Sequence, residues 1–139
     1  SRGIVGLAMD KTIAETLTLQ ALNQAVLRRS PPKGLVYHSD RGSQYAGNDF
    51  KALLAKNEFI GSMSKKGDCW DNAVAESFFH TLKVEFIHRM KFKTREEAKR
   101  KIFEYVETYY NRKRAHSSLG YMSPLEFETQ AVTSLQTVH

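Results

Sequence analysis

The sequence predicts an α/β domain that continues into a helical tail, and three observations lead to this prediction. Short runs that favour extended backbone alternate with longer amphipathic segments in the first part of the chain. Only helical patterns follow in the last part. The 139 residues, of which 41% are hydrophobic, suffice for one packed core. We therefore expect an α/β core over residues 1–93 and a helical C-terminal extension over residues 94–139.

The first part of the chain is expected to alternate strands with helices. Residues 4–9 predict a strand, because isoleucine and valine favour extended backbone. Thr12 and Glu15 have the spacing of a capping box, so a helix is expected to open at Thr12 and to end at Ser30, before two prolines. Three elements are then expected in order: a buried strand at residues 35–38, a helix at about 48–57 and a short strand at 59–63.

The last part of the chain is expected to be helical after one loop. Residues 64–72, SKKGDCWDN, are polar and contain glycine, which is typical of a loop. The helix expected at about residues 71–86 has an apolar face made by Ala75, Phe78, Phe79, Leu82 and Phe86. Thr94 and Glu97 form a second capping box, and the helix that they open has the apolar stripe Ala98, Ile102, Tyr105, Val106 and Tyr109. The start of a last helix is predicted by Ser123, Pro124 and Glu126, with proline at the first helical position.

The charge of the chain predicts a polyanionic partner. The formal net charge is +6 and the isoelectric point is about 9.5. Basic residues gather in four clusters, at residues 28–33, 65–66, 88–101 and 111–116. Four clusters in a chain this short favour nucleic acid as the partner. No run approaches the roughly 18 apolar residues that a membrane span needs. A single cysteine fits a reducing, cytoplasmic setting.

Two carboxylates, Asp40 and Glu76, are candidates for chemistry because of their positions. Asp40 follows the strand expected at residues 35–38, and α/β folds tend to place ligand sites at the carboxyl ends of strands. Glu76 lies near the start of a long helix, with Lys83 on the same side two turns further on. A carboxylate binds a hard divalent cation, and a lysine at that spacing can hold a phosphate. Each acid also has an ordinary structural reading, as a turn residue and as a favourable charge at a helix start.

The spacing of these residues resembles that of a known family. Asp40 and Glu76 are separated by 35 residues, and Lys83 follows seven residues after Glu76. This resembles the D-x(35)-E motif, with its downstream lysine or arginine, of the integrase and transposase superfamily. The stretches HSDRGSQY, KKGDCWDNAVAESFFHTLKVE and YNRKRAHSSLGYMSPLEFE resemble the catalytic core of insertion-sequence transposases of the IS-three group, which are related to retroviral integrases. The resemblance is specific because three long motifs occur in the right order, and it covers nearly the whole chain.

The resemblance implies a ribonuclease-H-like fold in which three acids bind two Mg²⁺ ions, or Mn²⁺ in their place. DNA end cleavage and strand transfer would follow by phosphoryl transfer. Asp40 matches the second acid and Glu76 the third, so both are expected to be catalytic and to bind metal. Lys83 matches the basic residue near the DNA end. The positions that shape the site, without an assigned chemical role, are matched by His38, Gly42, Gln44, Trp70, Asp71 and Asn72. With the basic clusters included, the residues expected to contact DNA are Lys83, Lys65, Lys66, Arg112, Lys113 and Arg114.

The first acid of the family pattern is not found in this chain. Asp10 does not replace it, because too few residues separate Asp10 from Asp40 for the strands that should lie between. We therefore expect an N-terminally truncated core that lacks the first two strands of the fold, binds metal weakly and is inactive alone. Unpaired strands invite pairing with another chain, so a homo-oligomer formed at the strand expected at residues 4–9 is also predicted.

Two other functions stay open on the sequence alone. The chain can be a non-catalytic DNA-binding module derived from a transposase, in which the basic clusters hold phosphates and the two acids no longer act. It can also be another ribonuclease-H-like nuclease that acts on RNA or junctions, although the tail YNRKRAHSSLGYMSP argues against this. Metal binding separates the first alternative from the transposase core, and substrate preference separates the second.

Overall fold

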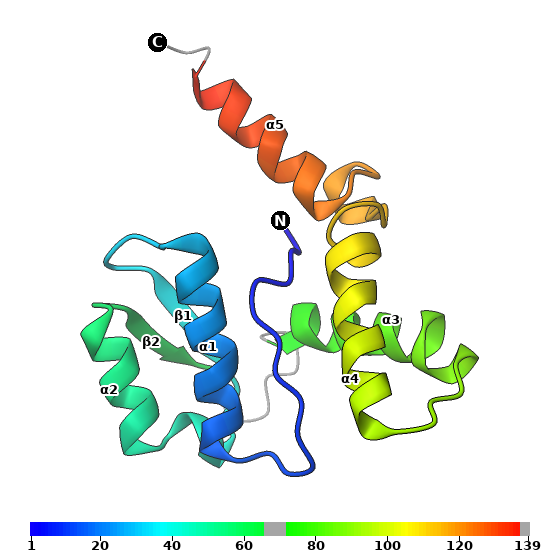
Figure 1. Cartoon of the computed structure of the whole chain (residues 1–139). Coiled ribbons are helices and arrows are strands. Elements are labelled where there is room, and N and C mark those ends of the chain that lie inside the picture. The colour runs from blue at the N-terminus through cyan, green and yellow to red at the C-terminus, as the bar shows by residue number, and fades with distance from the viewer. Residues whose placement is uncertain (66–71, 137–139) are drawn as a thin grey trace. The chain divides into compact units, whose positions relative to one another are not determined.

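The computed structural model describes residues 1–65 and 72–136, and the chain divides into two compact units. One unit is Val5–His80, and the other combines Ser1–Ile4 with the described part of Thr81–His139. Within the described residues the fold is mixed α/β, with α-helices and a two-stranded parallel sheet (Figure 1). The division expected after residue 93 stays a prediction.

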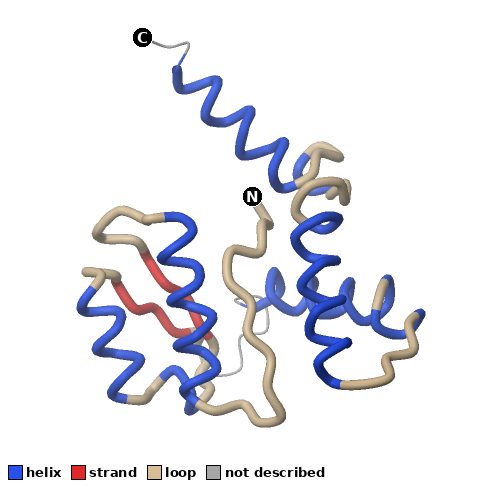
Figure 2. The backbone as a smooth tube through the Cα atoms, viewed as in Figure 1, coloured by secondary structure: helices blue, strands red, loops and turns tan. Residues whose placement is uncertain are grey.

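The unit Val5–His80 is built on the parallel sheet. Strands β1 (Val36–Ser39) and β2 (Ile60–Met63) lie side by side, as Figure 2 shows, and pair from first residue to last. Helix α2 (Asn48–Lys56) lies in the crossover between them, because parallel strands cannot be joined by a tight turn. Helix α1 (Glu15–Arg29) packs against α2 and against the short 3₁₀ turn η1 (Ser43–Tyr45). The expected strand–helix–strand order is therefore confirmed for β1, α2 and β2.

The core of this unit lies against one face of the sheet. Its buried side chains come from α1, α2 and the residue before β2, and they are Leu22, Phe50 and Phe59. Tyr37 of β1 meets Phe50 edge-on, with ring centroids 5.4 Å apart. Val36 and Ile60 pair with each other and point to the opposite face, because successive side chains alternate along a strand. These two side chains are 59% and 57% exposed, so that face is uncovered within the described residues.

Residues 4–9 do not form the predicted strand. Side chains, not a neighbouring strand, hydrogen-bond the backbone groups of Ile4 and Leu7. The Ile4 N–H donates to Asn111 Oδ1 at 2.8 Å, and Asn111 Nδ2 donates to the Ile4 carbonyl at 2.9 Å. The Leu7 N–H donates to Gln24 Oε1 at 3.2 Å. The prediction is wrong because a strand needs a partner, and no strand of the described residues lies beside this segment. The predicted pairing of two copies through residues 4–9 stays a prediction.

Helix α1 begins later than predicted, and its first capping box does not form. Ala14 occupies the N-cap position without a side-chain bond, so Thr12 lies outside the helix. The Glu15 carboxylate accepts the Phe50 N–H at 2.8 Å, in the first turn of α2. A carboxylate is stabilised by the free amide groups of any helix start. The tertiary contact with α2 therefore replaces the local cap.

The other unit is helical, and its predicted caps are confirmed. Its elements are α3 (Ala73–Glu85), which begins in the first unit, then η3 (Ile87–Arg89), α4 (Arg95–Glu104), η4 (Tyr105–Tyr110), η5 (Ser117–Leu119) and α5 (Pro124–Gln136). The Glu97 N–H donates to Thr94 Oγ1 at 3.1 Å at the start of α4. At the start of α5, the Ser123 N–H donates to Glu126 Oε2 at 2.7 Å. No helix of the described residues is long and apolar enough to cross a membrane.

Two apolar faces differ from the prediction: Tyr109 is exposed after α4, and Ala75 and Phe79 are exposed on α3. The helix after α4 widens into the π-turn η4, in which the Asn111 N–H reaches the Val106 carbonyl at 3.0 Å. A π-turn holds one more residue than an α-turn, so Tyr110 is buried while Tyr109 is 44% exposed. On α3, Phe79 is 52% exposed although Phe78 is buried. The buried stripe of α3 is narrower than the sequence pattern indicates.

Candidate active site

Asp40 lies directly after β1, with an exposed side chain. Its Oδ1 accepts the Gly42 N–H at 2.7 Å, which closes a turn around the carboxylate. Burial raises the pKa of Tyr37 to about 12, with further contributions from Tyr45 and from the negative charge of Asp40. Burial, followed by the charge of Asp40, also raises the pKa of Tyr45. An acid at the end of the strand thus borders the aromatic core on one side and solvent on the other.

Glu76 lies in the first turn of α3 and is also exposed. Lys83 lies in the last turn of the same helix, seven residues further along, with an exposed side chain. At 1.5 Å per residue the two Cα atoms are about 10 Å apart along the helix axis, on the same side. The helix therefore carries a carboxylate near one end and a cation near the other.

Hydrogen bonds connect the strand that leads to Asp40 with the start of α3. Ser64 follows β2 and is only 3% exposed. Its N–H donates to the Ser39 carbonyl at 2.9 Å, and its Oγ donates to Asn72 Oδ1 at 2.8 Å. Asp40 comes directly after Ser39, and Glu76 lies one helical turn after Asn72. The start of α3 is therefore held at the edge of the sheet from which Asp40 emerges.

Most of the basic residues predicted to contact DNA are exposed. Lys65 is exposed just after β2, whereas Lys66 lies outside the described residues. Arg112 and Lys113 are exposed directly after η4. Within the described residues these side chains are placed at the surface, where a phosphate backbone can reach them.

Arg114 differs from its neighbours because it is held in an ion pair. Its Nη2 donates to Glu85 Oε1 at 2.6 Å and its Nε donates to Glu85 Oε2 at 2.8 Å. The hydrogen bond from Arg114 is the main reason why the pKa of Glu85 lies below its usual value. Tyr105 donates to the same carboxylate at 3.3 Å. The pair was not predicted, because its partners are far apart in sequence and leave no local signal. A DNA contact by Arg114 stays a prediction.

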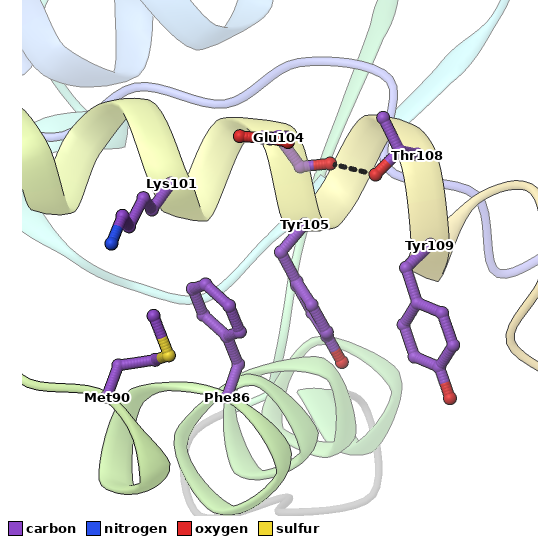
Figure 3. A pocket seen from close by; sticks show the side chains of 7 residues that line it. All are labelled: Phe86, Met90, Lys101, Glu104, Tyr105, Thr108 and Tyr109. Carbon is purple, nitrogen blue, oxygen red and sulfur yellow. Dashed lines mark hydrogen bonds between the residues drawn. The ribbon is translucent and has the colours of Figure 1, made fainter.

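A separate cavity of about 350 Å³ lies in the helical unit (Figure 3). Its lining residues come from the segment after α3, from α4 and from η4, and they are Phe86, Met90, Lys101, Glu104, Tyr105, Thr108 and Tyr109. The rings of Phe86 and Tyr105 stack with centroids 4.6 Å apart. None of the predicted site residues lines this cavity, so it is distinct from the candidate active site.

The donor atoms at the candidate site are of the kind that a hard divalent cation prefers. Among the described residues, no three His, Cys, Asp or Glu side chains gather closely enough to hold a metal ion. Mg²⁺, however, is commonly bound through one or two carboxylates, with water and substrate phosphate oxygens filling the remaining positions. The carboxylates of Asp40 and Glu76 are therefore chemically suited to Mg²⁺ or Mn²⁺.

Known proteins resemble the chain over almost its full length. Two family models described as "Integrase core domain" match residues 1–69 and 76–132. The transposase InsF for insertion sequence IS3A of Escherichia coli (strain K12) is 45% identical over 130 residues, which are 94% of this chain and 45% of that protein. The transposase for insertion sequence element IS904 of Lactococcus lactis subsp. lactis (strain IL1403) is 45% identical over 128 residues, or 92% and 51% of the two chains.

The chain spans about half the length of these curated relatives. The two family matches include both predicted acids, since Asp40 lies inside the first match and Glu76 opens the second. The predicted resemblance is thereby confirmed. The chain belongs to the integrase core family, in the branch of the IS3-type transposases.

Proposed function

We propose that this chain is part of the catalytic core of a DNA transposase, which cleaves element ends and joins them to target DNA. Membership of the integrase core family supports this proposal and implies a ribonuclease-H-like fold. The observation that carries it is the hydrogen bonding of Ser64, which ties the start of α3 to the end of β1. Two elements that each bear an acid are thus held at one edge of the sheet, where α/β folds place their ligands.

Asp40 and Glu76 are the proposed catalytic and metal-binding residues. Bound Mg²⁺ or Mn²⁺ would supply activation of the attacking hydroxyl group and stabilisation of the leaving oxygen. The two carboxylates would hold the ions through hard oxygen ligands. Lys83, further along the same helix, would hold a phosphate of the DNA end and so fix the position of the scissile bond.

The proposed DNA contacts lie around this site and on the tail. Lys65 and Lys66 follow β2, while Arg112, Lys113 and Arg114 follow η4. Cations on these segments would neutralise DNA phosphates and release counterions, so binding should weaken steeply as salt rises. Arg114 would contact DNA only through the donors that Glu85 leaves.

We further propose that the third acid of the site comes from outside these 139 residues. Two carboxylates are enough for weak metal binding, but the family pattern implies three acids. The chain alone should therefore not transfer strands. Within the described residues β1 pairs only with β2, which leaves its other edge open to further strands of the complete fold.

The proposed function is tested by titrating the chain with Mn²⁺ and Mg²⁺ in a calorimeter. Asp40→Asn and Glu76→Gln remove one anionic ligand each and should abolish the weak binding of the wild type. Asp49→Asn is the matched control, because Asp49 is an exposed acid in the first turn of α2. Equal Mn²⁺ affinity in the wild type and in both site variants would overturn the metal site.

A second candidate function is a DNA-binding module without catalysis. It is favoured by the finding that the described residues gather no group of three possible metal ligands. In that case neither Mn²⁺ nor Mg²⁺ binds, and Glu76→Gln leaves DNA affinity unchanged. Robust strand transfer by the 139-residue chain would instead show that its own residues complete the site.

A further inference from the structure

We infer that Ser64 is a positioning residue. It holds the start of α3 beside Asp40 and thereby sets the distance between the two acids of the proposed metal site. This inference rests on the proposed function and adds a residue to it. Ser64 carries no charge and would not touch metal or DNA. Its proposed role is to fix the distance between the two acids.

The backbone of Ser64 is held by the residues on either side of Asp40. The Ser64 N–H donates to the Ser39 carbonyl at 2.9 Å. Arg41 Nε donates to the Ser64 carbonyl at 2.9 Å. Ser64 is 3% exposed, so water does not compete well for these bonds. The peptide groups of Ser64 are therefore fixed relative to the backbone that bears the Asp40 carboxylate.

The hydroxyl group of Ser64 then reaches the start of α3. Ser64 Oγ lies 2.8 Å from Asn72 Oδ1 and 3.1 Å from the Ser39 carbonyl. A hydroxyl group has one proton to donate. The Ser39 carbonyl already accepts the Ser64 N–H, and the Asn72 bond is the shorter of the two. The Ser64 hydroxyl proton is therefore assigned to the hydrogen bond with Asn72 Oδ1.

A histidine supports this orientation of the hydroxyl group. His38 Nδ1 lies 3.1 Å from Ser62 Oγ, and His38 Nε2 lies 3.5 Å from Ser64 Oγ. With the imidazole proton on Nε2, Ser62 donates to His38, His38 donates to Ser64, and Ser64 donates to Asn72. Every donor in this series points in one direction, and such hydrogen bonds strengthen one another. Ser62 lies at the far end of the series, furthest from Asn72.

The consequence for the site follows from helical geometry. Asn72 and Glu76 are four residues apart, so they lie on one side of the helix start, one turn from each other. Without the Ser64 hydroxyl group, this turn loses its side-chain tie to the end of β1. The Glu76 carboxylate would then sample positions too far from Asp40 to share an ion, although each acid would keep its chemistry.

The test is a double-mutant cycle on the 139-residue chain with Mn²⁺ as the probe. Ser64→Ala and Asn72→Ala should each weaken Mn²⁺ binding by about tenfold, the lower end of the cost of losing a group that orients metal ligands. The double variant should be no weaker than either single variant, because both changes break the same bond. Ser117→Ala, at an exposed serine of η5 that is outside this series, should leave the affinity within about twofold of the wild type, well below that cost.

Two further measurements separate this inference from its alternatives. Thermal unfolding of each variant shows whether the fold is kept; a merely structural serine would lower the melting temperature and leave Mn²⁺ affinity unchanged, which would overturn the inference. Amide hydrogen exchange in the first turn of α3 needs no metal. Faster exchange in Ser64→Ala but not in Ser117→Ala supports the positioning role even if the wild type binds no Mn²⁺, in which case only the proposed metal site fails. Equal amide exchange rates in both variants overturn the positioning role of Ser64.

Discussion

The ion pair between Glu85 and Arg114 makes the stability of the chain depend on acid pH. The bonds from Arg114 lower the pKa of the folded Glu85 carboxyl below its usual value of 4.5. A carboxyl with a depressed folded pKa contributes stability above its unfolded pKa and loses it as pH falls through the folded pKa. The pair is therefore expected to stabilise the chain at neutral pH and to stop doing so in acid.

Glu85→Gln tests this dependence. At neutral pH we expect the variant to lose about 1–2 kcal/mol of unfolding free energy, after allowance for the partial exposure of the pair. As pH falls through the folded pKa of Glu85 the two proteins should converge, because the wild-type carboxyl is then protonated as well. The measurement is urea unfolding at a series of pH values, and a constant difference across the series would contradict the assignment.

Arg112 and Lys113 should contribute to DNA binding through their charges on phosphates alone. Each change to alanine should weaken binding to all DNA sequences alike and lower the slope of log affinity against log salt by about 0.9, because one phosphate is no longer neutralised. Lys56→Ala is the control, since Lys56 is an exposed lysine at the end of α2. Fluorescence anisotropy at several salt concentrations gives the slopes. An unchanged slope in both variants would remove these two residues from the DNA surface.

At the scale of elements, the sequence predicts the features that depend on contacts between residues close together in the chain. The caps at Thr94 and Ser123 were predictable because the bonding partners lie three residues apart. The cap at Thr12 was not, because Glu15 bonds α2 instead. The strand at residues 4–9 failed for a similar reason, since its pairing depends on residues distant in sequence. The π-turn has no local signature either, and it moves the buried stripe from Tyr109 to Tyr110.

Asn111 is expected to be the residue that holds the N-terminal segment to the helical unit. Its side chain bonds both the N–H and the carbonyl of Ile4, and its own carbonyl accepts the Leu125 N–H at 2.9 Å. Asn111→Ala removes the two side-chain bonds and should cost about 1–3 kcal/mol of unfolding free energy. Deletion of residues 1–4 should cost the same, and the two changes together should not add. Additive losses would show that Asn111 acts elsewhere.

For the whole molecule, sequence spacing points to the two proposed acids but not to the hydrogen bonds between the elements that bear them. Asp40 and Glu76 could be proposed because their separation and the motifs around them match the family pattern. Ser64 was not, because a serine in a polar segment has no distinctive pattern; its importance rests on burial and on bonds to residues far along the chain. The mixed α/β class is therefore readable from one sequence and the two acids can be proposed from it, while the residues proposed to support the site are found only in the coordinates.

The open edge and uncovered face of the sheet predict self-association at a second surface, besides the pairing through residues 4–9 that the sequence predicts. Val36 and Ile60 are more than half exposed, and β1 has a free edge within the described residues. Val36→Lys places a charge on this surface and should shift the chain to monomer in sedimentation equilibrium. Leu27→Lys is the control, because Leu27 is an 82% exposed apolar residue on α1. A wild type that stays monomeric at high concentration would contradict the prediction.

The central claim is that the carboxylates of Asp40 and Glu76 meet to share divalent ions. The most direct measurement is a crystal structure of the chain grown with Mn²⁺, with the ion located by its anomalous scattering. We predict an anomalous peak within about 2.1 Å of an oxygen of each carboxylate, the distance typical of such ions. Carboxylates that face away from each other, with no peak between them, would contradict the account.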